Sequence, residues 1–583
     1  MIRVFAAGAL LVLWTALVFL SLGSLPAARA GEETNAQRLL LAKRPRLVVV
    51  ISIDQFRADY LQRFADLYLP PKSRDGKPGG FRYLMSAGST FLDAHYRYAP
   101  TFTCVGHAAM LSGASPYKSG IVSNRWWDKA TQSEVYCVED ADQRVVGAAE
   151  GSKAKPMGSK MLRVTTVGDE LKLATGGAAK VVSMALKDRA AIMMGGHAQD
   201  VSIWFDETGG RWISSTAFAR DGKLPTWVEA LNTEAIPNRS LGTSWSPMVP
   251  AAALARTIAS DIKPEQARGF GAVFPHRIGA EPTSANYSLF TLLPAANAFV
   301  FETAKRAVTA EKLGQHDVPD LLAINLSTND YVGHVFGPDS PEVLDLSVQT
   351  DRQLAGFLQF LASAIPGGLR EVIVVLTGDH GVAPIPEQSQ ERGIPSGRIS
   401  VTDLLETVDR VLVGAFGGGP WTIKSAGAFV DPNLYLSAPA IEQALKSGKA
   451  QSRAQIEDLA AQTLTLLPGV YAAYTRNQIE RGQVPDTAIG RAVVLGFHPK
   501  VSGDVVVVAA PGWYPGIGNA STSHGSPYSY DTNVPLLIAG PGIRAGMWVD
   551  PVSPADIAPT LSLLLGIVAP SGNDGTILKQ ALR

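Results

Sequence analysis

The chain has 583 residues, of which 46% are hydrophobic and 18% are charged. That composition is typical of a globular protein and excludes a fibrous or disordered one. Its 52 basic and 52 acidic residues balance, so no nucleic acid polymer or anionic lipid surface is expected as a partner. The length favours a large domain that carries insertions over a single simple core.

The first thirty residues differ in composition from the rest. Arg3 precedes an apolar run from Val4 to Leu22, and Pro26-Ala-Ala-Arg-Ala30 offers an A-x-A cleavage site. This pattern is typical of a secretory signal peptide, so we expect cleavage after Ala30 and a periplasmic or secreted mature chain of residues 31–583. The competing interpretation is an uncleaved anchor, because the apolar run is long enough to span a bilayer. We predict no other membrane span, because the later apolar runs are short and interrupted.

The chain has two cysteines, Cys104 and Cys137. In an exported protein such a pair is most simply explained by one disulfide bond, which would join residue 104 to a predicted strand at 134–138. Two separate buried thiols are the alternative.

Apolar, β-branched runs recur along the chain and predict buried strands. They lie at 46–53, 179–186, 321–326, 372–377 and 534–539. Helical patterns lie between them at 165–175, 295–310 and 341–364. Strands that alternate with helices predict an α/β fold, with a mainly parallel sheet flanked by helices.

Two regions interrupt this alternation. Residues 201–295 are rich in Trp, Ser, Pro and Gly, and predict an inserted cap of loops and short strands. Residues 384–510 contain a Gly-Gly-Gly-Pro turn at 417–420, a helical pattern near 452–467 and a strand pattern at 504–510. We interpret them as a second insertion in one catalytic domain.

Thr103 lies between the first predicted strand and a helical pattern that starts at Ala108. A hydroxyl at that place lies near a helix N-terminus, where backbone N–H groups and the helix dipole favour an anion. The simpler alternative is that Thr103 only caps the helix, as threonine often does.

Residue types that bind metals follow the predicted core strands. They are Asp54, Asp330, His334, Asp379, His380 and His524. Ligands of open α/β sheets bind beyond the carboxyl ends of the strands, so we expect these side chains to converge. The spacing of four places Asp330 and His334 on one face of a helix. Mixed Asp/His sets suit zinc, and a pair of such sites is the usual clamp for in-line phosphoryl transfer. Such sets also accept Mn or Co, and an additional structural Ca²⁺ is left open.

The segment Thr103-Cys-Val-Gly-His107 matches the nucleophile motif T-x-x-G-H. With the metal-type residues, it makes the chain resemble the alkaline phosphatase superfamily, and most of all its threonine-dependent PafA-like alkaline phosphatases. The resemblance runs from about Val48 to Leu565 and implies two zinc ions. It implies one zinc at Asp54, Thr103, Asp379 and His380, and the other at Asp330, His334 and His524.

Several other residues lie in or beside this motif. Val105 and Cys104 depart from the pattern of the family. These differences affect the expected shape of the turn, not the presence of the Thr103 hydroxyl. Thr101 lacks the spacing to Gly106 and His107. Cys104 is expected to face elsewhere, and His107 to have a structural role.

Three further residues bear on the substrate. The amide of Asn124 is suited to donate to a phosphate oxygen, and the alternative is an ordinary turn asparagine. Lys187 and Arg189 follow the strand at 179–186, and they point to one face if the extended conformation continues. The alternative is a solvated charged turn. PafA-like phosphatases carry an Asn with a K-x-R pair for phosphate, whereas related phosphodiesterases generally lack the pair, so the resemblance favours monoesters.

The sequence thus predicts a secreted, monomeric two-zinc alkaline phosphatase that hydrolyses small phosphate monoesters. Thr103 would form a phosphothreonine intermediate, and Asn124, Lys187 and Arg189 would hold the phosphate. The alternative on the same scaffold is a phosphodiesterase or nucleotide pyrophosphatase. A non-catalytic zinc-dependent binding protein is the third hypothesis. A sulfatase is disfavoured, because no Arg follows Thr103 or Cys104 at the spacing that sulfatases use.

Overall fold

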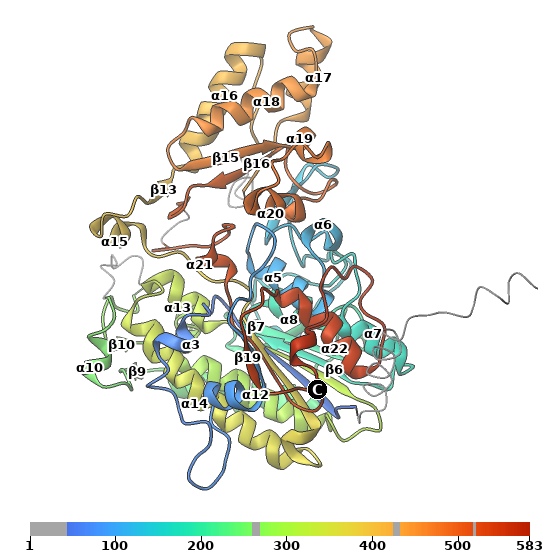
Figure 1. Cartoon of the computed structure of the whole chain (residues 1–583), viewed down its shortest axis with the longest axis vertical. Coiled ribbons are helices and arrows are strands. Elements are labelled where there is room, and N and C mark those ends of the chain that lie inside the picture. The colour runs from blue at the N-terminus through green and yellow to red at the C-terminus, as the bar shows by residue number, and fades with distance from the viewer. Residues whose placement is uncertain (1–43, 259–268, 424–431, 517–519) are drawn as a thin grey trace, which may run out of the picture. The chain divides into compact units, whose positions relative to one another are not determined.

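The computed structural model describes residues 44–258, 269–423, 432–516 and 520–583 (Figure 1). The predicted signal peptide and its cleavage site lie outside these residues. Among the helices of the described part, none combines the length and apolarity needed to cross a bilayer.

A ten-stranded sheet is built in the order β19-β2-β18-β12-β1-β11-β6-β7-β8-β5. Its five central strands run parallel to one another. They are β12 (Val372–Thr377), β1 (Leu47–Ile53), β11 (Asp320–Leu326), β6 (Val181–Ala185) and β7 (Val201–Asp206). All five are buried along their whole length. The predicted α/β fold with a mainly parallel sheet is confirmed.

The outer strands of the sheet are mostly antiparallel. They are β2 (Ser89–Phe91), β5 (Val145–Val146), β8 (Arg211–Ser215), β18 (Leu536–Ala539) and β19 (Gly546–Trp548). The run predicted at 534–539 therefore does form a core strand, but β18 pairs with β12 in the antiparallel sense.

Side chains of β1 alternate between two hydrophobic layers, as strand geometry requires. Leu47, Val49 and Ile51 pack in the layer that contains α12 (Pro294–Ala310) and α14 (Pro341–Ala364). Val48 and Val50 pack in the layer of α5 (Thr103–Ser112), α7 (Val167–Ala174) and α22 (Ile557–Leu565). Helices therefore cover both faces of the sheet (Figure 1).

The region 201–295 contains core strands as well as irregular structure. β7 and β8 belong to the central sheet, so an inserted segment there would begin only after Ser215. Some of the Trp and Ser residues that favoured a loop lie within these two strands and are buried, namely Ser202, Trp204, Trp212, Ser214 and Ser215. The later elements are α9 (Thr226–Glu234), η1 (Ile236–Ser240), β9 (Ser244–Trp245), α10 (Ala251–Leu254), β10 (His276–Arg277) and α11 (Ser284–Phe290).

The region 384–510 has a hydrophobic core and a small sheet of its own. Strand β16 (Val505–Ala509) pairs with β14 (Asn433–Leu434) and β15 (Val470–Thr475), and α18 (Arg453–Thr465) packs on them (Figure 1). The helix and strand predicted near 452–467 and 504–510 are α18 and β16. The other elements here are α15 (Pro386–Glu391), β13 (Gly397–Ile399), α16 (Val401–Phe416), α17 (Ala438–Lys446), α19 (Arg476–Glu480) and α20 (Ala488–Gly496).

Short elements complete the described chain. They are α3 (Tyr60–Arg63), α4 (Phe81–Ala87), α6 (Pro116–Ser119), the antiparallel pair β3 (Arg125–Asp128) and β4 (Ser133–Tyr136), α8 (Asp188–Gly195), α13 (Thr328–Phe336), η2 (Gly368–Glu371), β17 (Trp513–Pro515), α21 (Ser529–Thr532), η3 (Pro554–Asp556) and η4 (Lys579–Ala581).

Candidate active site

The metal-type side chains meet beyond the carboxyl ends of β1, β11 and β12. Asp54 follows β1, Asp330 lies in α13 after β11, and Asp379 and His380 follow β12. Nε2 of His380 lies 3.6 Å from Asp54 Oδ1 and 3.2 Å from Asp379 Oδ2. The ring of His524, from the loop before α21, stacks on that of His380 with the ring centres 3.5 Å apart. Residues separated by up to 470 positions thus share one site.

Two overlapping groups of these side chains have a geometry that could hold a cation. One consists of Asp54, Asp379 and His380, and the other of Asp330, His380 and His524. Within each group the ligand atoms lie within 4.8 Å of one another. His334 lies one helical turn after Asp330, as its spacing predicts, with its Nε2 3.2 Å from Asp330 Oδ1.

The carboxylates are buried in a way that favours a bound cation. Asp54 Oδ1 and Asp379 Oδ2 are buried without a hydrogen-bond partner. Burial, and then the charge of Asp379, raise the pKa of Asp54 well above its ordinary value. Burial also raises the pKa of Asp379 to about 6. Because a buried carboxylate oxygen without a hydrogen-bond donor destabilises the fold, the residues present fit a bound divalent cation.

Lys187 joins the two groups in this structure. Its Nζ lies 2.7 Å from Asp54 Oδ2 and also forms an ion pair with Asp330 Oδ2. Burial opposes ionisation of Asp330, yet Lys187 and then His334 hold the pKa of its carboxyl well below the ordinary value. The ammonium group of Lys187 therefore lies in the centre of the site.

The extended conformation, on which a shared face for Lys187 and Arg189 depends, does not continue beyond β6. β6 ends at Ala185, Lys187 is the N-cap residue of α8, and Arg189 lies in the first turn of that helix. The carboxylate of Asp188 accepts the backbone N–H of Arg189 at 2.6 Å, and an acidic residue is favourable in a first helical turn. Arg189 is instead held by Tyr136, whose hydroxyl oxygen accepts from Nη1 at 3.1 Å.

Thr103 is the first residue of α5, which begins five residues earlier than the pattern at Ala108 predicts. The N-cap position belongs to Phe102, and no side chain caps this helix, so capping does not explain the threonine. Its buried Oγ1 lies 3.4 Å from His380 Nε2. The hydroxyl therefore faces the metal-type side chains from a helix N-terminus.

Gly106 and His107 explain the rest of the motif. A Cβ on Gly106 would lie 2.2 Å from the backbone oxygen of Asp379, so only glycine allows α5 to approach the end of β12 this closely. His107 Nδ1 donates to the backbone oxygen of Thr103 at 2.7 Å, while its Nε2 accepts from the amide of Asn325 at 2.9 Å. This arrangement is the structural role expected of His107.

The remaining predicted features also lie beside Thr103. Cys104 and Cys137 form the predicted disulfide bond. The side-chain oxygen of Asn124 accepts from the backbone N–H of Cys104 at 2.9 Å, which places the asparagine next to the motif.

Gln55 is a residue of the site that sequence reasoning missed. Its backbone N–H donates to Asp379 Oδ1 at 2.9 Å, and its side-chain Nε2 donates to Asp330 Oδ1 at 2.8 Å. It therefore links a carboxylate of one group to a carboxylate of the other. Its φ of 61° is in the left-handed region, which is uncommon for a residue other than glycine. The sequence offers no signal for this role except that Gln55 follows Asp54.

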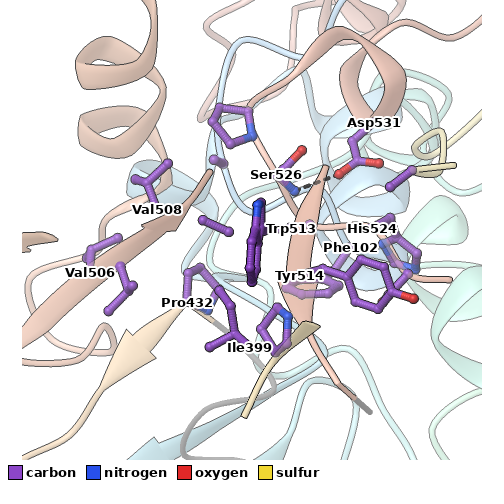
Figure 2. A pocket seen from close by; sticks show the side chains of 18 of the residues that line it. Phe102, Ile399, Pro432, Val506, Val508, Trp513, Tyr514, His524, Ser526 and Asp531 are labelled. Atoms are coloured by element: carbon purple, nitrogen blue, oxygen red, sulfur yellow. Dashed lines mark hydrogen bonds between the residues drawn. The ribbon is translucent and has the colours of Figure 1, made fainter. Parts of the chain in front are cut away.

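A largely apolar pocket borders His524 and Phe102 (Figure 2). It encloses about 740 Å³ of empty space, including the part that opens to solvent. Val506 and Val508 of β16 line it, together with Trp513 and Tyr514 of β17. In its wall, the carboxylate of Asp531 accepts from the backbone N–H of Ser526 at 2.8 Å (Figure 2). Burial raises the pKa of Asp531 to about 7.

Residues 48–527 match the sequence profile of a family described as type I phosphodiesterase / nucleotide pyrophosphatase. The chain belongs to this family. The chain is 34% identical over 546 residues to alkaline phosphatase PhoV of Synechococcus elongatus, with 93% of each chain covered. It is 31% identical over 553 residues to alkaline phosphatase PafA of Elizabethkingia meningoseptica, with 94% of this chain and 96% of PafA covered.

Solved structures agree with these relatives. The crystal structure of wild-type PafA superposes with a TM-score of 0.82 at 30% identity, over 93% of this chain and 99% of PafA. The predicted resemblance to the threonine-dependent PafA-like branch is therefore confirmed. Murine ectonucleotide pyrophosphatase/phosphodiesterase 5 superposes with a TM-score of 0.52 at 15% identity, which is a likeness of fold alone.

Proposed function

We propose that this family member is a two-zinc alkaline phosphatase that hydrolyses phosphate monoesters through a phosphothreonine at Thr103. PhoV and PafA, which this chain matches over nearly its full length, are alkaline phosphatases, and this supports a phosphoric monoester hydrolase. The observation that carries the proposal is the position of Thr103 Oγ1. It lies at the N-terminus of α5, 3.4 Å from a histidine that both cation-binding groups share.

The proposed ligands follow the two groups of side chains. Asp54, Thr103, Asp379 and His380 would hold one zinc ion, and Asp330, His334 and His524 the other. When bound, a zinc pair supplies Lewis-acid polarisation and neutralises charge that develops on the attacking and leaving oxygens.

Thr103 performs the covalent step in this proposal. Its oxygen attacks phosphorus in line, a new P–O bond forms, and the bond to the leaving alcohol oxygen breaks. The proton that Thr103 loses is balanced by the proton that the leaving oxygen gains, through solvent. Water then attacks the phosphothreonine, which releases inorganic phosphate and restores the hydroxyl. The positive end of the α5 helix dipole favours the negative charge that surrounds Thr103 in both steps.

Asn124, Lys187 and Arg189 would hold the nonbridging oxygens. A monoester dianion carries one more negative charge than a diester, so it gains more from an ammonium and a guanidinium together. Lys187 is 4% exposed and already neutralises buried carboxylates, which supports an electrostatic role inside the site rather than on a solvated turn.

A comparison of two aryl esters tests the proposal. We expect the Lys187→Ala/Arg189→Ala variant to lose at least about 100-fold in kcat/KM on nitrophenyl phosphate, and much less on methyl nitrophenyl phosphate. Thr103→Ala should abolish turnover of both. Equal losses on the two esters would argue against the proposed role of Lys187 and Arg189, and undiminished turnover by Thr103→Ala would overturn the assignment of the nucleophile.

We also propose that the enzyme acts in the periplasm or outside the cell. The Cys104–Cys137 disulfide supports this location, because structural disulfides persist in oxidising compartments and are rare in the cytosol.

A further inference from the structure

We propose that Cys104, Tyr136 and Cys137 form a brace that positions the two phosphate-binding side chains Asn124 and Arg189 beside Thr103. This inference rests on the proposed function and adds to it positioning residues for the phosphate site. It also gives a physical role to Cys104, which departs from the usual motif.

The disulfide ties the nucleophile to the β3–β4 pair. Cys104 directly follows Thr103 in the first turn of α5, and Cys137 directly follows the last residue of β4. Both cysteines are completely buried. A covalent bond therefore fixes the end of β4 against the turn that presents the Thr103 hydroxyl.

Both halves of this disulfide hold Asn124. The backbone N–H of Cys104 donates to Asn124 Oδ1 at 2.9 Å, and the backbone N–H of Cys137 donates to the backbone oxygen of Asn124 at 3.0 Å. Because a backbone N–H can only donate, the side-chain atom that faces Cys104 must be the amide oxygen. The amide nitrogen then points away from Cys104, with two N–H groups available for a phosphate oxygen.

Tyr136, the residue before Cys137, holds Arg189. Its hydroxyl donates to Asp188 Oδ1 at 2.5 Å and accepts from Arg189 Nη1 at 3.1 Å. The orientation of the guanidinium is therefore set by a residue next to the disulfide. Nε of Arg189 is buried without a hydrogen-bond partner, which leaves donor capacity for a ligand.

The nucleophile and the two braced phosphate donors come from separate segments of the chain. Thr103 belongs to α5, Asn124 precedes β3, and Arg189 belongs to α8. Donors that are fixed before the substrate binds require no reorganisation when charge develops, and small displacements are costly. Loss of the brace should therefore weaken phosphate binding and kcat/KM while the metal content stays the same.

The test uses the full-length, zinc-loaded enzyme and removes one hydroxyl. We expect Tyr136→Phe to raise the Ki of inorganic phosphate and to lower kcat/KM for nitrophenyl phosphate, each by about 10-fold. The same substitution should have little further effect in an Arg189→Ala background, because Tyr136 acts through Arg189. Tyr287→Phe is the matched control, since it removes a hydroxyl that donates to Asn238 at 2.7 Å. Zinc content should equal that of the wild type in all variants.

Either of two results would overturn the role of Tyr136. One is an unchanged Ki and kcat/KM in Tyr136→Phe, and the other is an equally large loss when Arg189 is already alanine. A wild-type enzyme without monoester activity would instead refute the proposed function, so the two failures are distinguishable.

The role of the disulfide is tested with the Cys104→Ala/Cys137→Ala variant in the same assays. We expect a higher Ki for phosphate than in the wild type, and no further rise when Asn124→Ala is added. An unchanged Ki in the folded variant would overturn the role of the disulfide. If this variant does not fold, phosphate inhibition of the wild type is compared before and after reduction of the disulfide, and the same rise in Ki is expected.

Discussion

Gln55 donates to Asp379 with its backbone and to Asp330 with its side chain. A Cβ on Gly333 would lie 1.9 Å from Gln55 Oε1, so the glycine makes room for the amide. The amide nitrogen of Asn329 donates to the backbone oxygens of Asp54 and Gln55 at 3.0 and 3.1 Å. The two groups of metal-type side chains are therefore joined by hydrogen bonds that fix the orientation of their carboxylates.

We expect Gln55→Leu to weaken binding of at least one zinc ion by about 10- to 100-fold, because hydrogen bonds to metal ligands contribute this much to affinity. Competition with a chelator measures the affinity. Gln349→Leu is the control, because Gln349 donates to the carboxylate of Asp345 at 2.7 Å in the same way. Wild-type affinity in Gln55→Leu would show that the orientation of Asp330 does not depend on this amide.

Asp531 makes stability depend on pH. Its folded pKa of about 7 lies above the ordinary value of 3.8, so the folded state favours the protonated form. This preference adds its full stabilisation to the folded state below pH 4, and the stabilisation is lost as the pH rises through 7. The free energy of unfolding thereby falls by up to about 4 kcal/mol for three pKa units. Asp531→Asn should therefore raise Tm at pH 8, and the difference should shrink toward pH 5. Thermal unfolding of metal-depleted protein measures it, because a bound cation would favour the carboxylate. A constant difference across this range would contradict the assignment.

The residues that could be predicted are those whose chemical type itself indicates a function. Aspartate and histidine at the ends of apolar runs predict a metal site, and Asp54, Asp379 and His380 do lie close together. Gln55 could not be predicted, because its role depends on a left-handed backbone and on Asp330, which lies 275 positions away. Tyr136 is a similar case, since its partner Arg189 is 53 positions away.

Helix α5 shows how a motif can serve packing and chemistry together. Thr103 presents the hydroxyl, and Gly106, one turn later, lies against the backbone of Asp379. The helix must approach the end of β12 closely for Thr103 to reach His380. The glycine of the motif is therefore required by backbone contact rather than by backbone conformation.

Gly106→Ala should separate α5 from the end of β12. We expect kcat/KM to fall on the order of 100-fold, since a misplacement of about 1 Å has that effect. We also expect the free energy of unfolding to fall by about 1 to 3 kcal/mol, as for other overpacked sites. Steady-state kinetics and denaturant unfolding measure the two effects. Gly356→Ala in α14 is the control, because its Cβ would meet no atom within 4 Å. Equal behaviour of the two variants would contradict the packing argument.

The sequence pattern predicts best the elements that pack in the core of the central sheet. β1, β12 and α14 were located from apolar runs and helical spacing to within a residue, because such patterns are strong in a buried core. β6 does not continue through Arg189, because α8 begins at Asp188. The sequence prediction places β7 in a cap, because its Trp and Ser residues do not distinguish a loop from a strand whose partners lie elsewhere in the chain.

At the scale of the whole molecule, a parallel sheet brings three strand ends together and the loop before α21 adds His524. The same topology places Lys187 and the α8 turn beside Asp330, since β6 pairs with β11. The region 384–510 and β17 contribute the apolar walls of the pocket next to His524 (Figure 2). The alkaline phosphatase relatives span this whole arrangement, including the region 384–510.

Anomalous diffraction at the zinc edge, from crystals of the zinc-loaded enzyme, tests the central claim most directly. We predict two peaks, one within about 2.0 to 2.2 Å of ligand atoms of Asp54, Asp379 and His380, and one at the same distance from those of Asp330, His334 and His524. Thr103 Oγ1 should lie beside the first peak. A single peak, or peaks away from these side chains, would contradict the account.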